Sequence, residues 1–226
     1  MTMNIFNNCN PNLNGEKRVF DQLPPGMTIF DIGCRRDSLF FNYSGIVHYF
    51  EPDPSSLNEL KNKSGCLNFK SYFNNFGLAD TSGTFEYFPK FQSFVDRKNS
   101  YGCDDSENIV KFELKTGSDY LFQNSINSVD FLKIDTEGYE LNVIKGFGDT
   151  IKSVRFIQFE YGGTFRDAGI KLKDIVAYLT GKNFTKFSYL SNNGLVPVKD
   201  IADHYQYCNI FCSNISHKPI SFELKS

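Results

Sequence analysis

Three carboxylates follow two apolar segments of this sequence, each at the point where a strand is expected to end. Asp135 and Glu137 come directly after the run 129–134, and Glu160 follows the run 154–159. Carboxylates in such places can accept a proton from a reacting hydroxyl or hold a divalent cation through hard oxygen ligands. Ligands of open α/β sheets bind beyond the carboxyl ends of the strands, so these acids are expected to face a small-molecule site.

The roles of these acids stay open between several possibilities. Asp135, Glu137 and Glu160 are candidate catalytic groups, and Asp135 and Glu160 are the ligands if a divalent cation is present. Glu137 could instead interact favourably with the dipole of the helix that follows it. Lys133 lies in an otherwise apolar run and would be costly to bury alone, so we expect it to pair with one of the acids.

Of the three histidines, only one is a candidate general base. His204 precedes the last expected strand, where the chain is expected to turn back toward the site. His48 lies inside an expected strand, and His217 lies in the C-terminal tail. We therefore expect those two to be structural or exposed.

A second corner is the segment 31–37, Asp-Ile-Gly-Cys-Arg-Arg-Asp. Gly33 allows a tight turn close to a ligand. Dinucleotide sites use several glycines and a helix N-terminus to receive a pyrophosphate, whereas Asp31 and Asp37 would repel that anion and suit a cationic ligand. Asp37 could instead cap a helix that starts at Ser38.

A third corner is Glu51, which ends the expected strand 46–50. It stands 18 residues after Gly33, a position from which an acid characteristically accepts hydrogen bonds from ribose hydroxyls. The alternative is a solvated acid before a proline turn. We favour the ribose contact.

Short apolar runs alternate with amphipathic stretches, which is typical of βαβ units and a mainly parallel sheet. The turn Asn192-Asn193-Gly194 predicts a late hairpin, and hence an antiparallel edge. The segment 77–80 is expected to open a loop, and 83–88 to pair with 109–114. Strands are expected at 28–32, 46–50, 67–72, 129–134, 154–159, 184–190 and 205–212, and helices at 54–62, 117–123 and 171–180. A further helix is expected to start at Glu137, to carry Glu140, Leu141, Val143 and Ile144 at helical spacing, and to end at Gly146 and Gly148.

Length and composition favour one domain, 1–226, with a polar N-terminal segment 1–20 and an insert 89–108 that is a candidate lid. The net charge of −2 disfavours a nucleic-acid partner. The six cysteines form no C-x-x-C pair, and no stretch approaches the roughly 18 apolar residues of a membrane span. We expect a soluble cytoplasmic protein without a signal peptide. The oligomeric state is not readable from the sequence.

Four ordered segments resemble the FkbM family of S-adenosylmethionine-dependent methyltransferases: Asp31-x-Gly33, 50–54, 77–80 and 130–140. The resemblance implies a Rossmann-like class I methyltransferase fold, with a mostly parallel seven-stranded sheet and O-methylation of a hydroxyl, commonly on a sugar or polyketide. It places Asp31, Gly33 and Cys34 beside the methionine part, Glu51 on the ribose, and Leu78 and Ala79 near the adenine. Neighbouring Arg35, Asp37, Pro52 and Asp53, together with Asp135, complete the candidate cofactor-binding set.

One departure from the family concerns the first loop, where Arg35, Arg36 and Asp37 replace the usual small residues and further glycine. The leading expectation is an O-methyltransferase that uses S-adenosylmethionine, with a divalent cation as a possible addition and a small-molecule or glycan hydroxyl as acceptor. A non-catalytic methyltransferase-like binding module is the alternative that the altered loop supports. A nicotinamide-dependent oxidoreductase is disfavoured by the missing glycines.

Overall fold

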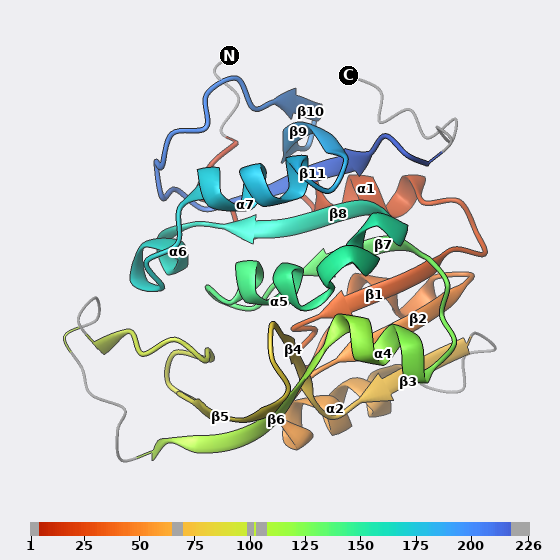
Figure 1. The fold of residues 1–226 in the computed structure, drawn as a ribbon, viewed down its shortest axis with the longest axis vertical. Coiled ribbons are helices and arrows are strands. Elements are labelled where there is room, and N and C mark those ends of the chain that lie inside the picture. Colours follow the sequence, from red (N-terminus) through yellow and green to blue (C-terminus); the bar gives the residue numbers. More distant parts are fainter. Residues whose placement is uncertain (1–4, 65–69, 99–101, 103–107, 218–226) are drawn as a thin grey trace.

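The computed structural model describes residues 5–64, 70–98, 102 and 108–217. Within these residues, one sheet of eight strands forms the centre of the fold (Figure 1). In spatial order its strands are β10 (Gly194–Pro197), β9 (Phe184–Ser191), β11 (Cys208–Asn214), β8 (Val154–Tyr161), β7 (Val129–Ile134), β1 (Thr28–Ile32), β2 (Ile46–Phe50) and β3 (Lys70–Asn74).

The predicted α/β architecture, with a mostly parallel sheet and an antiparallel edge, is confirmed. Strands β8, β7, β1, β2 and β3 are parallel neighbours. Strand β11 runs antiparallel between β8 and β9, and the predicted hairpin joins β9 to β10. The sheet has eight strands rather than seven among the described residues, because the chain after the Asn192-Asn193 turn pairs back onto β9.

Two of the expected strands have shifted boundaries. The structure has β3 from Lys70, where 67–72 was predicted; positions 67–69 lie outside the described residues. The strand predicted at 205–212 begins only at Cys208. Tyr205 has a φ of 52°, a left-handed conformation that an extended strand does not allow, so the strand starts after it.

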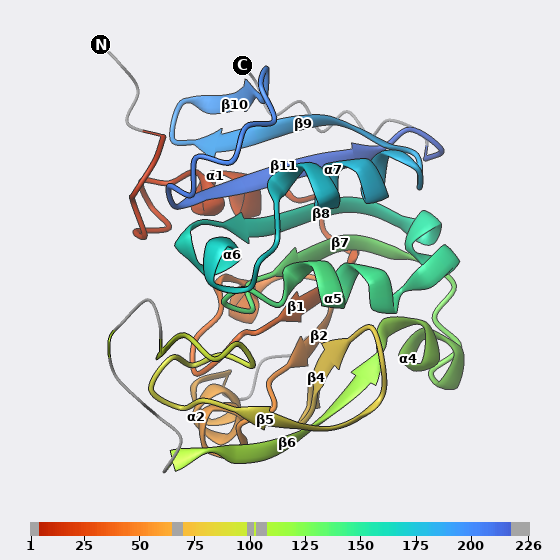
Figure 2. The ribbon, with the colours of Figure 1, turned by 60° about the vertical axis from the view of Figure 1, so that its left-hand side comes forward.

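Helices cover both faces of the main sheet (Figures 1 and 2). Alternation along the strands gives each face an apolar surface: in β1, Ile29 packs with one buried cluster and Phe30 with the other. One face carries α1 (Glu16–Gln22), η1 (Leu39–Asn42) and α2 (Pro54–Ser64), and the other carries α4 (Gly117–Gln123), α5 (Glu140–Gly146), η3 (Gly148–Ser153) and α7 (Leu172–Thr180). The short helix α6 (Gly163–Asp167) follows β8.

Helix α1 was not predicted from the polar segment 1–20. It has only seven residues, too few for a clear 3.6-residue period, and Val19 is the one that it buries. Its position is set by tertiary packing, because Val19 joins the cluster that also contains Phe40 and Phe131. The N-terminal segment is therefore part of the packed fold.

A second sheet of three strands lies beside the main one, in the order β4 (Gly77–Ala79), β6 (Val110–Thr116) and β5 (Gly83–Tyr87). The predicted pairing of 83–88 with 109–114 is confirmed as an antiparallel ladder between β5 and β6. The prediction that 77–80 opens a loop was wrong for its first three residues. They pair in parallel with β6, over thirty positions away, and no local pattern encodes that partner.

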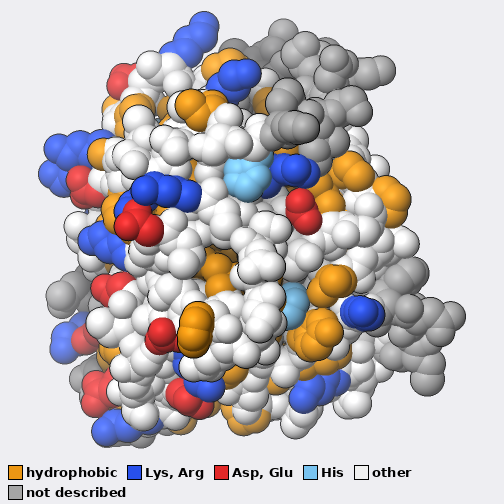
Figure 3. All heavy atoms as spheres, turned by 45° about the vertical axis from the view of Figure 1, so that its right-hand side comes forward, with side chains coloured by type: hydrophobic (Ala, Val, Ile, Leu, Met, Phe, Trp, Pro, Cys, Tyr) orange, Lys and Arg blue, Asp and Glu red, His pale blue; other side chains and the backbone are white. Residues whose placement is uncertain are grey.

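None of the helices within the described ranges combines the length and apolar character needed to cross a membrane. The face in Figure 3 carries basic and acidic side chains interspersed, in keeping with the near-neutral total charge.

Candidate active site

Two cavities lie at the carboxyl ends of the parallel strands. The larger has a volume of about 710 Å³, and the smaller, of about 40 Å³, is narrow. Arg35 and Asp135 line both, so the two cavities meet at these side chains. This is the edge at which open α/β sheets bind their ligands.

The three predicted acids converge at this edge. Asp135 follows β7, Glu137 lies two residues further on, and Glu160 lies near the end of β8. One carboxylate oxygen of each lies within 4.8 Å of those of the other two. The backbone N–H of Asp135 donates to the carbonyl oxygen of Ile32 at 3.0 Å, which fixes the corner of β7 against the corner of β1.

Asp135 and Glu160 share a hydrogen bond and titrate as a pair. Burial, followed by the charges of Asp135 and Glu137, raises the pKa of Glu160 well above its ordinary value. Burial also acts to raise the pKa of Asp135, but Lys133, Arg35 and the hydrogen bond from Glu160 outweigh it and hold that pKa below its ordinary value. Of the two carboxyl groups, Glu160 is therefore the one that holds a proton more tightly, and Asp135 is the one that ionises first.

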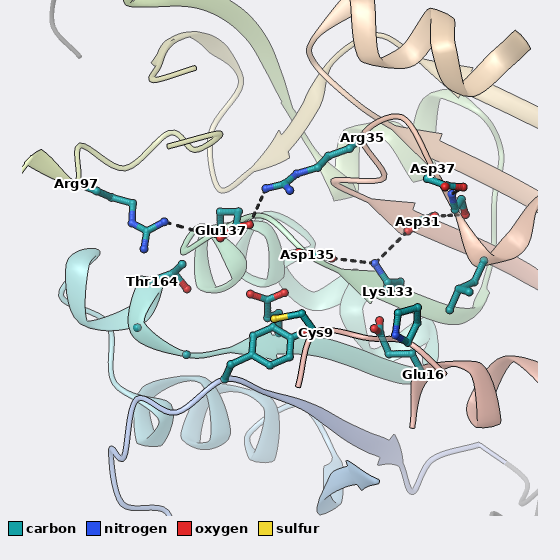
Figure 4. Close-up of a pocket in the computed structure, with 17 residues that line it drawn as sticks. Cys9, Glu16, Asp31, Arg35, Asp37, Arg97, Lys133, Asp135, Glu137 and Thr164 are labelled. Atoms are coloured by element: carbon teal, nitrogen blue, oxygen red, sulfur yellow. Dashed lines mark hydrogen bonds and ion pairs between the residues drawn. The ribbon is translucent and has the colours of Figure 1, made fainter. Parts of the chain in front are cut away.

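Lys133 pairs with acids on both sides, as predicted. Its Nζ donates to Oδ2 of Asp135 at 3.2 Å and lies 3.7 Å from Oδ1 of Asp31 (Figure 4). Asp31 and Lys133 are direct partners in the register of β1 and β7. The ammonium thus compensates the buried carboxylate of Asp31 and the partly exposed one of Asp135, both of which line the larger cavity.

Glu137 is held by two arginines from distant parts of the chain (Figure 4). A nitrogen of Arg35 donates to Oε1 at 2.6 Å, and Arg97 lies 3.9 Å from Oε2. Arg97 also donates to Oδ2 of Asp167 in α6 at 2.8 Å. The alternative that placed Glu137 at the start of the next helix was wrong, because α5 begins at Glu140.

Glu140 organises the loop that carries these acids, and sequence reasoning missed it. Its fully buried carboxylate accepts hydrogen bonds from the backbone N–H groups of Thr136 and Gly138, at 2.9 and 3.0 Å, and from the Thr136 hydroxyl. Glu137 between them has a φ of 54°, a strained conformation for a residue with a Cβ. The sequence feature that could have predicted this role is the position of Glu140, an acid only three residues after Glu137.

Gly33 turns the first loop against the loop after β7. Its φ is +78°, and a Cβ at this position would lie 1.9 Å from the carbonyl oxygen of Asp135. Only glycine fits this close approach. The predicted tight turn is therefore present, and it brings the first loop to the edge of the smaller cavity.

Glu51 lines the smaller cavity and is almost fully buried. Its Oε2 accepts from the backbone N–H of Arg35, and its Oε1 accepts from that of Asp53, both at 2.9 Å. Burial raises the pKa of Glu51 to about 7. The alternative of a solvated acid is excluded by its 4% exposure.

The structure brings most of the predicted site residues to the two cavities. The larger one is lined by Asp31, Arg35, Asp37, Asp135, Glu137 and Glu160. The smaller one is lined by Gly33, Arg35, Glu51, Pro52, Leu78 and Asp135. The other predicted residues, Cys34, Asp53, Ala79 and His204, line neither cavity.

Packing and capping explain the positions of three of these four. The Cys34 thiol is buried in the apolar cluster and donates to the carbonyl oxygen of Phe50. The Asp53 carboxylate accepts from the backbone N–H groups of Ser55 and Ser56 in the first turn of α2. Ala79 is fully buried in β4, against Gly146 of α5.

His204 is held by its own contacts outside the larger cavity. Its Nδ1 accepts from the backbone N–H of Gln206 at 3.1 Å, and its Nε2 lies 3.3 Å from the hydroxyl of Tyr189. Burial lowers the pKa of His204, so the neutral ring is favoured. His48 is buried, as expected for a structural histidine, with Nδ1 2.8 Å from the hydroxyl of Tyr120.

Asp37 does not cap the helical turn that follows the first loop. The turn is the 3-10 helix η1, and Ser38 caps it by accepting from the backbone N–H of Phe40. Asp37 instead accepts from the backbone N–H of Ser38 at 2.9 Å while lining the larger cavity.

Several lining residues come from segments that sequence reasoning did not assign to the site. For the larger cavity they include Cys9, Pro11, Glu16, Arg97, Thr164 and Tyr207. For the smaller cavity they include Tyr87, Gln92, Phe94, Thr136 and Tyr139. The insert 89–108 contributes Gln92, Phe94 and Arg97, but its positions 99–101 and 103–107 lie outside the described residues.

A divalent cation at the acid cluster stays a prediction. The oxygens of Asp135, Glu137 and Glu160 are donors of the type that Mg²⁺ and Ca²⁺ prefer. Asp135 already pairs with Lys133, and Glu137 with Arg35, so cationic side chains compensate these charges in part. Chelation during a turnover assay tests the cation directly.

The buried glutamates predict how stability depends on pH. Burial raises the pKa of Glu51 and of Glu140 from 4.5 to about 7, so the folded protein binds these protons more tightly than the unfolded chain. Their stabilising contribution is full below pH 4.5 and is lost as the pH rises to about 7. We expect the free energy of unfolding, measured by urea denaturation, to fall across this window.

The matched control for this pH dependence is Glu51→Gln, which removes the titrating carboxyl group of Glu51 and leaves that of Glu140. In this variant the free energy of unfolding should fall less steeply with pH. The lowered pKa of Asp135 acts in a separate window, below its ordinary value of 3.8, where acid removes stability. A free energy of unfolding that rises steadily from pH 5 to 7 would contradict the raised pKa values of Glu51 and Glu140.

A mostly parallel α/β sheet with acids at its carboxyl edge is typical of proteins that bind a small ligand beyond the strand ends. The chain belongs to the family described as Methyltransferase FkbM domain, which matches residues 35–186. The resemblance drawn from the sequence motifs is thereby confirmed. Asp31 and Gly33 lie just before the matched range.

Two curated relatives have similar sequences. The hexuronic acid methyltransferase AglP of Haloferax volcanii is 25% identical over 134 residues, covering 59% of this chain and 52% of the relative. The 2-O-methyltransferase NoeI of Sinorhizobium fredii is 25% identical over 156 residues, covering 61% and 64%. The chain thus spans between half and two thirds of the length of these relatives.

Among solved structures, a TehB-like methyltransferase from Corynebacterium glutamicum is 12% identical, with a TM-score of 0.48 and coverage of 88% of this chain and 87% of that one. Magnesium protoporphyrin IX methyltransferase from Synechocystis is 13% identical, with a TM-score of 0.47 and coverage of 88% and 80%.

Proposed function

We propose that this chain is an S-adenosylmethionine-dependent O-methyltransferase that methylates a sugar hydroxyl in a glycan or glycolipid. Membership of the FkbM methyltransferase family supports the reaction class. The observation that carries the proposal is that Asp135, the more acidic member of its pair with Glu160, lies where the two cavities meet. The carboxylate of Asp135, which can accept a proton, therefore lies between the larger and the smaller cavity.

The residues at the smaller cavity and beside it fit the cofactor. Glu51 presents a buried carboxylate of the kind that accepts hydrogen bonds from ribose hydroxyls, and Gly33 leaves room for close backbone approach. Asp31 has a buried Oδ1 without a hydrogen-bond partner among the described residues, as expected where a ligand supplies the donor. When bound, S-adenosylmethionine supplies an electrophilic methyl group on a positively charged sulfur.

Asp135 is the proposed proton acceptor. A sugar hydroxyl is a weak nucleophile while protonated, so its proton must leave as the new bond forms. The carboxylate of Asp135 can take that proton, and the neighbouring Glu160 and Lys133 hold it in a fixed position. Positioning of the hydroxyl next to the cofactor supplies the remaining acceleration.

The acceptor space is the far part of the larger cavity, lined by Glu160, Thr164, Arg97 and Tyr207. These polar side chains suit a ligand rich in hydroxyl groups. AglP is described as a hexuronic acid methyltransferase and NoeI as a 2-O-methyltransferase, which supports a sugar acceptor. Arg97 is a cation in this space that could meet an acidic sugar.

We extend the proposal to the organisation of the chain. Residues 1–226 act as one domain, supported by Cys9, Pro11 and Glu16 lining the larger cavity beside residues of later strands. The insert 89–108 acts as a lid, supported by the hydrogen bond from the Ser93 hydroxyl to the carbonyl oxygen of Glu137 at 2.8 Å. The scattered cysteines of the sequence favour a reducing, cytoplasmic location.

The lid explains why the smaller cavity is narrow. Gln92 and Phe94 from the insert line it together with Tyr87 and Tyr139, and Phe94 packs against both tyrosines. A volume of about 40 Å³ does not admit a nucleoside. The proposal therefore includes movement of these side chains when the cofactor enters.

The test begins with calorimetric titration of the protein with S-adenosylmethionine, S-adenosylhomocysteine and NAD. Binding of the two S-adenosyl compounds and not of NAD is the expected result. Methyl transfer from labelled cofactor is then measured on a panel of neutral sugars, hexuronic acids and oligosaccharides that contain them. Binding of neither S-adenosyl compound would overturn the proposal, and cofactor binding without transfer to any glycan would favour the binding-module alternative.

A further inference from the structure

Asp31 and Lys133, which both line the larger cavity, form a pair whose hydrogen-bonding capacity is not fully used (Figure 4). Oδ2 of Asp31 accepts from the hydroxyl of Ser38, but Oδ1 has no hydrogen-bond partner in the part of the chain that the structure describes. The side chain of Asp31 is only 2% exposed. A buried carboxylate oxygen in this state is costly unless a ligand supplies a donor.

Lys133 has the complementary property, because its ammonium group has hydrogen-bond donors that no described residue accepts. An ammonium carries three donors, and within the described residues Nζ of Lys133 makes one hydrogen bond, to Asp135. The ammonium lies 3.2 Å from Oδ2 of Asp135 and 3.7 Å from Oδ1 of Asp31. It therefore presents a positive charge in the lining of the larger cavity, with hydrogen-bond donors that no described residue uses.

A ligand that satisfies both side chains must carry a cation and an anion close together. Oδ1 of Asp31 can accept a hydrogen bond, most strongly from a cationic donor. Nζ of Lys133 lies 3.7 Å away and can donate to an anionic acceptor. An α-amino acid group has an ammonium and a carboxylate on the same carbon. The two side chains together are thus complementary to the zwitterionic end of an amino acid.

The location of the pair indicates which ligand this is. Asp31 precedes by two residues Gly33, which lines the smaller cavity with Glu51. The nucleoside side of the site and the pair are joined through this short first loop, whereas Arg97 and Thr164 line the cavity from the insert and from α6. The pair therefore belongs to the cofactor and not to the acceptor.

We propose that Lys133 binds the α-carboxylate of the cofactor's methionine end, while Oδ1 of Asp31 receives the adjacent ammonium. This inference rests on the proposed function, because it assigns a residue to the same cofactor. It makes Lys133 a determinant of specificity for ligands that carry the carboxylate. It also explains why a lysine stands in the otherwise apolar strand β7.

The test compares two ligands that differ only in this carboxylate, S-adenosylhomocysteine and its decarboxylated analogue. Their dissociation constants are measured by calorimetry for the wild type and for Lys133→Met. We expect the wild type to prefer the carboxylate-bearing ligand by about 10- to 100-fold, and Lys133→Met to reduce that preference below about threefold. If Lys133 had only a structural role, Lys133→Met would weaken the binding of both ligands equally and leave the ratio of their dissociation constants unchanged.

The matched control is Lys63→Gln, which removes a positive charge that lies 3.6 Å from Oδ2 of Asp37, a lining residue of the same cavity, while Lys63 itself lines neither cavity. It should keep the wild-type preference, because only Lys133 contacts the carboxylate. Equal loss of preference in both variants would show a long-range charge effect and overturn the inference. Thermal unfolding verifies that each variant is folded.

The wild-type measurement keeps the inference falsifiable even if Lys133→Met does not fold. A wild-type preference below about threefold would by itself overturn the role of Lys133 while leaving cofactor binding intact. Failure of the wild type to bind S-adenosylhomocysteine at all would instead overturn the proposed function. The two failures are therefore distinguishable.

Discussion

Replacement of Asp135 by asparagine is expected to lower the turnover number for methyl transfer by about 10²- to 10⁴-fold, the range typical of a lost general base. The amide has nearly the same shape but cannot take the proton of the acceptor hydroxyl. It also breaks the pairing with Glu160 and leaves Lys133 with one acid. The measurement is transfer of labelled methyl to the best acceptor found on the glycan panel.

The matched control for this variant is Asp130→Asn at the opposite end of the same strand. Asp130 accepts from the backbone N–H of Thr28 at 2.9 Å and pairs with Arg155, but it lines neither cavity. It should cost some stability and leave the turnover number near that of the wild type. Full turnover in Asp135→Asn would remove this carboxylate from the reaction.

Replacement of Glu51 by alanine is expected to raise the dissociation constant for S-adenosylhomocysteine by about 10- to 100-fold. Charge-assisted hydrogen bonds are worth about 1.5–3 kcal/mol each, and the proposed ribose contact would be lost. The backbone N–H groups of Arg35 and Asp53 would also lose their acceptor, so the first loop should loosen. Calorimetric titration at a fixed pH gives the constant.

Glu59→Ala is the control for this second experiment. Glu59 lies on α2, its side chain is about half exposed, and its ion pair with Arg36, at 3.8 Å, is of the weak surface kind. Affinity should be unchanged in this variant. If Glu51→Ala binds the ligand as tightly as Glu59→Ala does, the ribose contact does not exist.

Local patterns were sufficient to predict the strands at the centre of the sheet. The bounds of β1, β2 and β7 agree with the predicted 28–32, 46–50 and 129–134. These strands are apolar runs closed by polar or glycine-containing corners, and both features are readable within a few residues. The acids at the corners were predicted for the same reason, because the end of a parallel strand is also the edge of the ligand site.

Contacts between distant segments were beyond such patterns. Strand β4 exists because residues 77–79 pair with β6, and no sequence within five residues of it encodes that partner. Likewise, the ion pair of Arg97 with Asp167 joins the insert to α6 across 70 positions. Neither residue has a neighbour in the sequence that distinguishes it from a solvated charge.

By itself, the sequence determined where along the chain most strands of the main sheet lie, the corners that carry Asp31, Glu51 and Asp135, and the family. These follow from short-range periodicity and from residue types at strand ends. Only the tertiary structure decided which of those residues face a cavity: it buried Cys34 and Ala79, kept His204 outside, and joined Lys133 to Asp31. The physical reason is that burial and pairing depend on the segments that pack around a residue, and those segments are distant in the chain.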